Sequence, residues 1–157
     1  MNNSDKNWRR VSLYAPLFIW IGVIFFLSGF GGSLDNTSRF IGPLLRFFFP
    51  DASPETLAFY HFFIRKAAHF TAYAILALLA YRAFVSLRRR AWISLVVVAL
   101  VAALDETNQA FNPSRSGALT DVFLDLSGGV AALIGVYVFA RRGAKSRERA
   151  PRESTRG

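Results

Sequence analysis

Four stretches of about twenty predominantly apolar residues constrain the fold of this chain more than any other feature. They cover residues 11–30, 66–85, 92–111 and 119–140. A bilayer core of roughly 30 Å needs about 20 helical residues to cross it. The first stretch has no charged residue, whereas the other three carry ionisable residues at one end. The sequence therefore predicts an all-α integral membrane bundle of four transmembrane helices.

The first apolar stretch has a second interpretation, as a cleaved secretory signal. Basic residues precede it in KNWRR, and small residues follow in SGFGGS. Its apolar run exceeds the roughly 7–15 residues of a signal core, and this length favours a retained anchor.

Basic residues are unevenly distributed around the apolar stretches. The chain has 19 Lys and Arg against 10 acidic residues and a net charge of +9. Long apolar runs bounded by basic clusters differ from a nucleic-acid module, in which Lys and Arg cover one face of a polar domain, so we expect no nucleic-acid partner. Fourteen of the 19 basic residues lie on the side that holds both termini and the turn between the second and third stretches. Because basic loops stay inside, both termini are predicted to be cytoplasmic.

This distribution also predicts three regions. Residues 1–10 form a cytoplasmic N-terminus, residues 11–142 the membrane domain, and residues 143–157 a disordered basic cytoplasmic tail that lies near anionic lipid. The chain has no cysteine, which excludes disulfides and thiolate metal sites.

The segment between the first and second stretches is rich in aromatic residues. It contains FIGPLLRFFFP and LAFYHFF. Phe-rich amphipathic pieces prefer the membrane interface to water, so we expect an interfacial outer segment over residues 31–65. Ser53 before Pro54 is typical of a helix N-cap and first turn.

Polar residues lie at the outer ends of the last three stretches, at the i, i+4 spacing that places side chains on one helix face. With both termini inside, these ends meet at one side of the membrane. Carboxylates there lie below the interface, at a depth where an unpaired charge costs a few kcal/mol, so the cluster is a functional-site hypothesis. The members are Arg65, Lys66, His69 and Tyr73, then Asp105 and Gln109, then Asp121 and Asp125.

These residues, within RKAAHFTAYAILALL and DETNQAFNPSRSGALTDVFLDLSGG, resemble the VanZ-like family of small polytopic bacterial membrane proteins. The family pattern has Lys, His and Tyr on one helix, Asp-Glu with a following Gln, Arg in a Pro-containing turn, and Asp opening the last helix. LSG at residues 27–29 is similar to the end of the family's first helix. The resemblance covers about residues 10–140. The matching positions are Lys66, His69, Tyr73, Asp105, Glu106, Gln109, Pro113, Arg115 and Asp121.

Two positions depart from the family pattern. Thr71 stands where an acidic residue is frequent, so this chain lacks a carboxylate close to His69 in sequence. Asp125 stands where Asn is frequent and supplies a carboxylate elsewhere.

The resemblance implies a multi-pass protein of the bacterial cytoplasmic membrane. The founding member is linked to low-level resistance to teicoplanin, and the family has no settled activity. With a polar site at the outer face of the membrane, we expect the ligand to be an amphiphile of the cell envelope, such as a lipid head group, a lipid-linked saccharide or a lipoglycopeptide. The outward-facing polar site would bind or modify it.

Three functions fit the cluster. A binding site would use Lys66, Tyr73, Gln109, Arg115 and Asp125. A hydrolase or transferase acting on a lipid-linked substrate would use Asp105, Glu106 or Asp121 as base and His69 as acid. A scaffold protein would keep the cluster as purely structural ion pairs.

The same residues could form a mixed oxygen and nitrogen metal site, from His69 and the four acids Asp105, Glu106, Asp121 and Asp125. Lys66 and Arg115 can neutralise these acids without an ion. The sequence therefore predicts no metal, and it assigns no cofactor.

Overall fold

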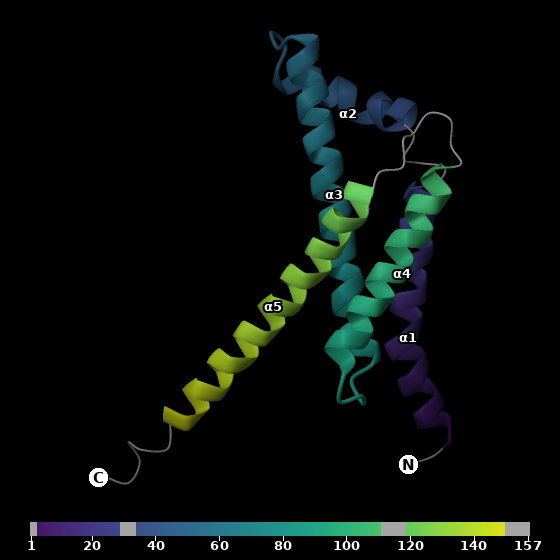
Figure 1. The fold of residues 1–157 in the computed structure, drawn as a ribbon, viewed down its shortest axis with the longest axis vertical. Coiled ribbons are helices and arrows are strands. Elements are labelled where there is room, and N and C mark those ends of the chain that lie inside the picture. Colours follow the sequence, from purple (N-terminus) through teal and green to yellow (C-terminus); the bar gives the residue numbers. More distant parts are fainter. Residues whose placement is uncertain (1–2, 29–33, 111–118, 150–157) are drawn as a thin grey trace.

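The computed structural model describes residues 3–28, 34–110 and 119–149, which fold into five helices (Figure 1). They are α1 (Asn3–Phe26), α2 (Leu34–Phe48), α3 (Pro54–Ala83), α4 (Arg90–Ala110) and α5 (Leu119–Arg149). Four of them, α1, α3, α4 and α5, are long and apolar enough to cross a membrane. The predicted all-α bundle with four membrane helices is confirmed.

Much of the apolar surface of these helices faces outward. Phe18, Ile19 and Phe139 are each about two-thirds exposed or more. A water-soluble protein rarely exposes contiguous apolar surface of this kind, whereas lipid tails solvate it at little cost. The outward-facing side chains therefore support the assignment as a multi-pass membrane protein.

Helix α3 is the centre of the bundle. It packs against α1, α2, α4 and α5, and its most extensive contact is with α5. Its inward face carries Tyr73, Leu76, Ala77 and Ala80, all fully buried. The two alanines allow the neighbouring helices to approach closely, as small residues do in membrane bundles. The core thus runs along one face of α3.

The start of α3 follows from its sequence. Ser53 accepts a hydrogen bond from the backbone N–H of Thr56 at 3.3 Å, and Pro54 occupies the first helical turn. The predicted N-cap is therefore confirmed. Residues 54–65 continue directly into the rest of α3, so this part of the outer segment forms a helical extension. At 1.5 Å per residue, the 30 residues of α3 span about 45 Å, more than a hydrocarbon core requires.

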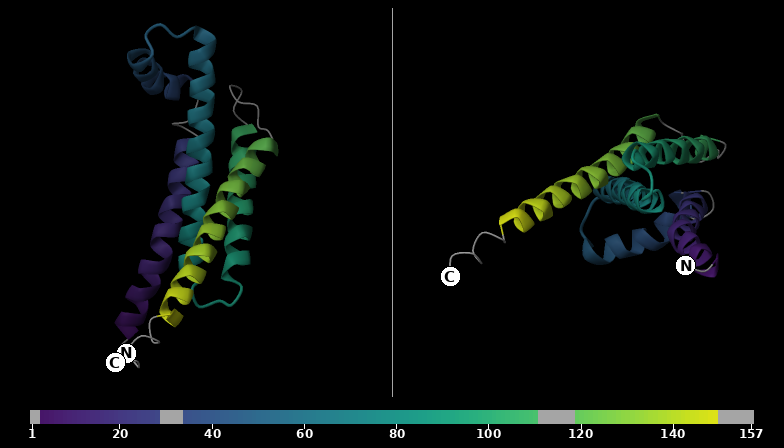
Figure 2. Two further views of the ribbon diagram at one scale, coloured as in Figure 1. Left: turned by 90° about the vertical axis from the view of Figure 1, so that its left-hand side faces the viewer. Right: turned by 90° about the horizontal axis from the view of Figure 1, so that it is seen from below.

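Helix α2 lies across the end of the bundle at which α3 begins (Figure 1). The start of α1, the turn between α3 and α4, and the end of α5 all point toward the opposite end, where α5 diverges from the other helices (Figure 2). This arrangement places the basic groups at residues 9–10, 88–90 and 141–145 at one end of the molecule.

The basic tail differs from its prediction. Residues 143–149 were expected to be disordered but belong to helix α5, whereas residues 150–157 lie outside the described part. Extending an existing helix avoids the cost of nucleation, and the segment is rich in Ala, Lys, Arg and Glu, which favour helix. The polar composition of residues 143–149 therefore does not end helix α5.

Candidate functional site

Helix α3 contributes His69 and Tyr73 from successive turns of one face. Their rings stack, with centroids 6.5 Å apart and planes inclined by 25°. Tyr73 is fully buried, and the His69 side chain is 22% exposed. The predicted i, i+4 relation thus aligns one fully buried and one partly accessible ring.

Helix α4 contributes Asp105, the most buried carboxylate of the described residues, with 1% exposure. Its Oδ2 accepts a hydrogen bond from the Tyr73 hydroxyl at 3.2 Å and one from Gln109 Nε2 at 3.0 Å. Asp105 Oδ1 has no hydrogen-bond partner among the described residues, although it is buried. One oxygen of this carboxylate is therefore fixed, and the other is available.

Helix α1 reaches the same cluster through Ser28, which the sequence-based site did not include. Residues 27 and 28 form a π-helical turn at the end of α1, and Ser28 is 6% exposed. Its Oγ accepts a hydrogen bond from Gln109 Nε2 at 2.8 Å. The LSG similarity at residues 27–29 was the available signal, but no spacing rule relates residue 28 to residue 109.

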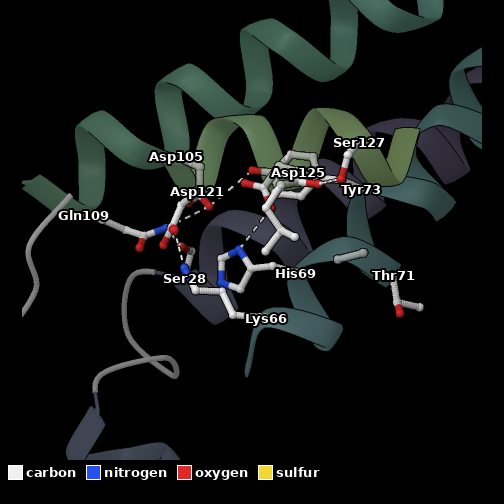
Figure 3. Close-up of polar contacts among 12 residues, drawn as sticks. Ser28, Lys66, His69, Thr71, Tyr73, Asp105, Gln109, Asp121, Asp125 and Ser127 are labelled. Carbon is white, nitrogen blue, oxygen red and sulfur yellow. Dashed lines mark hydrogen bonds and ion pairs between the residues drawn. The ribbon is translucent and has the colours of Figure 1, made fainter. Parts of the chain in front are cut away.

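Helix α5 contributes Asp125, which is 2% exposed. Its Oδ1 lies 3.4 Å from His69 Nδ1, an ion-pair distance without hydrogen-bond geometry (Figure 3). Thr71, by contrast, donates a hydrogen bond to the backbone of Ala67 and lies on the exposed side of α3. Thr71, which replaces the family's acidic residue, therefore does not contact the clustered carboxylates. Asp125, which replaces the family's Asn, is one of them.

Two glycines allow α5 to pack close enough for this contact. A Cβ at Gly128 would lie 2.3 Å from the backbone oxygen of Phe70, the residue after His69. A Cβ at Gly129 would lie 3.1 Å from a methyl group of Val98 on α4. The glycines therefore serve helix packing.

Lys66 and Asp121 form a separate ion pair between α3 and α5. Each lies about one helical turn from the contact between His69 and Asp125, since Lys66 precedes His69 by three positions and Asp121 precedes Asp125 by four. Lys66 also lies over the ring of Phe62, 5.2 Å from its centroid. The structure therefore pairs this lysine with the outermost of the aspartates.

The remaining predicted residues are placed less centrally. Glu106 is half-buried on α4, directly after Asp105. Arg115 and Pro113 lie outside the described residues. Arg65 is half-buried and borders two cavities.

The larger cavity lies between α1 and α3 and has a volume of about 650 Å³. Its wall is mostly apolar and includes Trp20, Ile24 and Ile75. Ala67, Ala68 and Ala72 of α3 also line it, and their small side chains leave the space open. Its polar lining residues are Ser28, Arg65, His69, Thr71, Tyr73 and Asp105.

The smaller cavity lies between α2 and the first turns of α3 and has a volume of about 380 Å³. It is lined by the three basic side chains Arg46, His61 and Arg65 and by apolar residues that include Leu45 and Phe62. Arg65 lines both cavities, so its side chain lies between them.

The donor set of the cluster is also suited to a cation. One ligand atom from each of His69, Asp105 and Asp125 can be chosen so that all three lie within 4.8 Å of one another.

Comparisons with known proteins assign the family. No curated protein and no solved structure matches the chain. The family described as VanZ/LLP1 matches residues 13–140, which include α3, α4, the clustered aspartates and both cavities. The chain therefore belongs to the VanZ/LLP1 family, as the resemblance in its polar motifs predicted.

Proposed function

We propose that this protein binds an anionic amphiphile of the cell envelope, with the apolar chain in the larger cavity and the head group near Arg65. The observation that carries the proposal is the cavity of about 650 Å³, whose lining is mostly apolar with a few polar and charged side chains that include Arg65. Ligand sites are typically apolar clefts with a few polar groups that fix orientation. An amphiphile likewise has an apolar chain and a polar head group.

The basic residues support an anionic head group. Arg46, His61 and Arg65 line the smaller cavity, whose described lining contains no acidic residue. Arginine binds phosphate through its planar guanidinium in a bidentate manner, which favours a phosphate-bearing head group. Phospholipids and lipid-linked saccharide precursors share this chemistry.

Filling the larger cavity tests the proposal. Ala68 lines it, so Ala68→Phe should occupy the space that a chain would use. Purified protein would be titrated with phosphatidylglycerol, phosphatidylethanolamine and a long-chain isoprenoid phosphate, and the bound lipid counted by native mass spectrometry. We expect at least about tenfold weaker binding of the preferred lipid in the variant, since the chain loses more than one buried CH₂ contact.

Ala103→Phe is the matched control, because Ala103 is exposed on α4 and lies outside both cavities. It adds the same ring to the surface and should bind as the wild type does. Equal binding by both variants would show that the cavity holds no chain. Selective binding of the isoprenoid phosphate would identify a precursor, and selective binding of phosphatidylglycerol a bulk lipid.

A hydrolase or transferase is the second candidate. His69 and Asp105 both line the larger cavity, so an acid and a base would lie beside a bound head group. Incubation of the protein with the bound lipid, followed by mass analysis, distinguishes the candidates. An altered lipid identifies an enzyme, and an unchanged lipid excludes a hydrolase and favours a binding protein.

Glycopeptide tolerance is the phenotype that follows from the binding proposal. A protein that holds a lipid-linked precursor or a lipoglycopeptide would change how much of the drug reaches its target. Expression of wild-type protein in a susceptible bacterium should therefore raise the inhibitory concentration of teicoplanin, and Ala68→Phe should reduce that effect.

A further inference from the structure

We propose that His69, Asp105 and Asp125 bind a divalent transition-metal ion of the zinc or manganese class. The three residues come from three different helices, α3, α4 and α5, and their side chains converge in the bundle (Figure 3). The inference does not depend on what occupies the cavities, because the ion alone can be measured.

The geometry is close to that of a bound site. The three ligand atoms lie within 4.8 Å of one another. Tetrahedral ligand atoms about 2.1 Å from a shared ion lie roughly 3.4 Å apart, so the widest of the three spacings would have to shorten by at most about 1.4 Å to complete the site. His69 Nδ1 and Asp125 Oδ1, at 3.4 Å, already have this spacing.

Two buried carboxylate oxygens of the cluster are available as metal ligands. Asp105 Oδ1 and Asp125 Oδ1 are buried and have no hydrogen-bond partner among the described residues. A carboxylate removed from water without compensation costs several kcal/mol. Within the described ranges, no Lys or Arg forms an ion pair with either aspartate, and Lys66 is paired with Asp121 instead. The sequence suggested that Lys66 neutralises the clustered acids, but in the structure it neutralises Asp121 and neither Asp105 nor Asp125.

The hydrogen bonds to Asp105 resemble those that orient a metal-binding carboxylate. Tyr73 and Gln109 both donate to Oδ2, which fixes the carboxylate and leaves Oδ1 for an ion. Metal-binding carboxylates are commonly oriented by such partners. Ser28 in turn accepts from Gln109, so α1 also supports the ligand.

The donor set selects the class of ion. One imidazole and two carboxylates suit zinc or manganese, whereas calcium and magnesium prefer six or more oxygen ligands. Three protein ligands leave a further coordination position. His69 and Asp105 line the larger cavity, so that position borders the proposed head-group end.

Elemental analysis tests the site directly. The full-length protein, purified through a tag without histidines, would be stripped with a chelator, loaded with Zn²⁺ or Mn²⁺ and desalted. We expect about one ion per chain in the wild type. Asp105→Asn and Asp125→Asn should each weaken binding by at least about tenfold. Loading with Co²⁺ should give visible absorption bands that both variants lose.

Asp121→Asn is the matched control, because it removes a carboxylate from the same helix as Asp125 but one that is paired with Lys66. It should retain the ion. Size-exclusion chromatography and circular dichroism would check that each variant folds. If an aspartate variant does not fold, His69→Gln removes a ligand at a more exposed position and is tested in its place.

Two results would overturn the inference. One is a wild-type protein that stays empty at saturating metal. The other is equal binding by wild type, His69→Gln and both ligand-removing aspartate variants. Should Arg115→Ala gain an ion that the wild type lacks, Arg115 and not a metal neutralises the aspartates.

Discussion

At the scale of single residues, Gln109 connects the cluster. Its Nε2 donates one hydrogen bond to Ser28 on α1 and one to Asp105 on α4. An amide nitrogen has two hydrogens, and both are used here. One side-chain amide that is 4% exposed therefore links α1 to Asp105 and, with the Tyr73 hydroxyl, orients that carboxylate.

Gln109→Glu keeps the shape of this side chain but replaces its donor group with an acceptor. Both hydrogen bonds are lost and a second carboxylate is placed beside Asp105. We expect a loss of about 1–3 kcal/mol in the free energy of unfolding, measured by denaturant titration in detergent.

Asn108→Asp is the control for that variant, since it makes the same amide-to-carboxylate change at the neighbouring exposed position. It should shift the free energy of unfolding by less than about 0.5 kcal/mol. Similar losses in both variants would mean that the hydrogen bonds of Gln109 do not stabilise the fold.

Residue spacing predicted part of this cluster. The i, i+4 rule placed His69 with Tyr73 and Asp105 with Gln109 on shared faces, and both pairs are in contact. It did not predict the bond to Ser28, because contacts between helices depend on rotation and depth. For the same reason the sequence did not separate Asp121, which is paired with Lys66, from Asp125.

At the scale of helices, the contact between α3 and α5 sets the distance between His69 and Asp125. Gly128 packs against the backbone of Phe70, and a backbone atom cannot move aside as a side chain can. In Gly128→Ala the two helices must separate locally. We expect a loss of about 1–3 kcal/mol in the free energy of unfolding, from overpacking.

Gly135→Ala on the same helix is the matched control. A Cβ there meets no atom within 4 Å. Alanine favours helix over glycine by about 1 kcal/mol, so this variant should be neutral or slightly more stable. The two glycines belong to one helix, and equal behaviour would contradict the close contact at Gly128.

Helix boundaries were predictable where local chemistry determines them. Ser53 and Pro54 identified the start of α3 because capping is a local interaction. The end of α5 was not predictable from charge, since a polar segment can continue a helix that packing has already formed. Ser53 and Pro54 also predicted a helical turn that leads into the second apolar stretch, and in the structure the aromatic first turns of α3 contact α2 as part of that helix.

At the scale of the whole molecule, basic residues collect at one end. Arg90 lies over the ring of Tyr81, and Arg141 over that of Tyr137, with distances of 4.1 and 4.6 Å to the ring centroids. Arginine and tyrosine pairs are typical of the interface of a membrane, and basic ends face the cytoplasm. Both termini are therefore predicted to be cytoplasmic.

Reporter insertions test this orientation. Fusions after Gly143 and within the turn at Arg89 should report the cytoplasm, and an insertion at Asp51, between α2 and α3, should report the exterior. A cytoplasmic reporter at Asp51 would reverse the orientation and place both cavities at the inner face. The variants Gly128→Ala and Gly135→Ala change no charge and should leave the topology as it is.

The position of the larger cavity, between two helices that each cross the membrane, has a consequence for how occupancy should be measured. An occupant with a long chain partitions into lipid and hardly dissolves in water, so it encounters the opening within the bilayer. Its occupancy then follows its mole fraction among the surrounding lipids and not its concentration in the buffer. Diluting the vesicles would leave occupancy unchanged, and diluting the ligand with inert lipid would lower it.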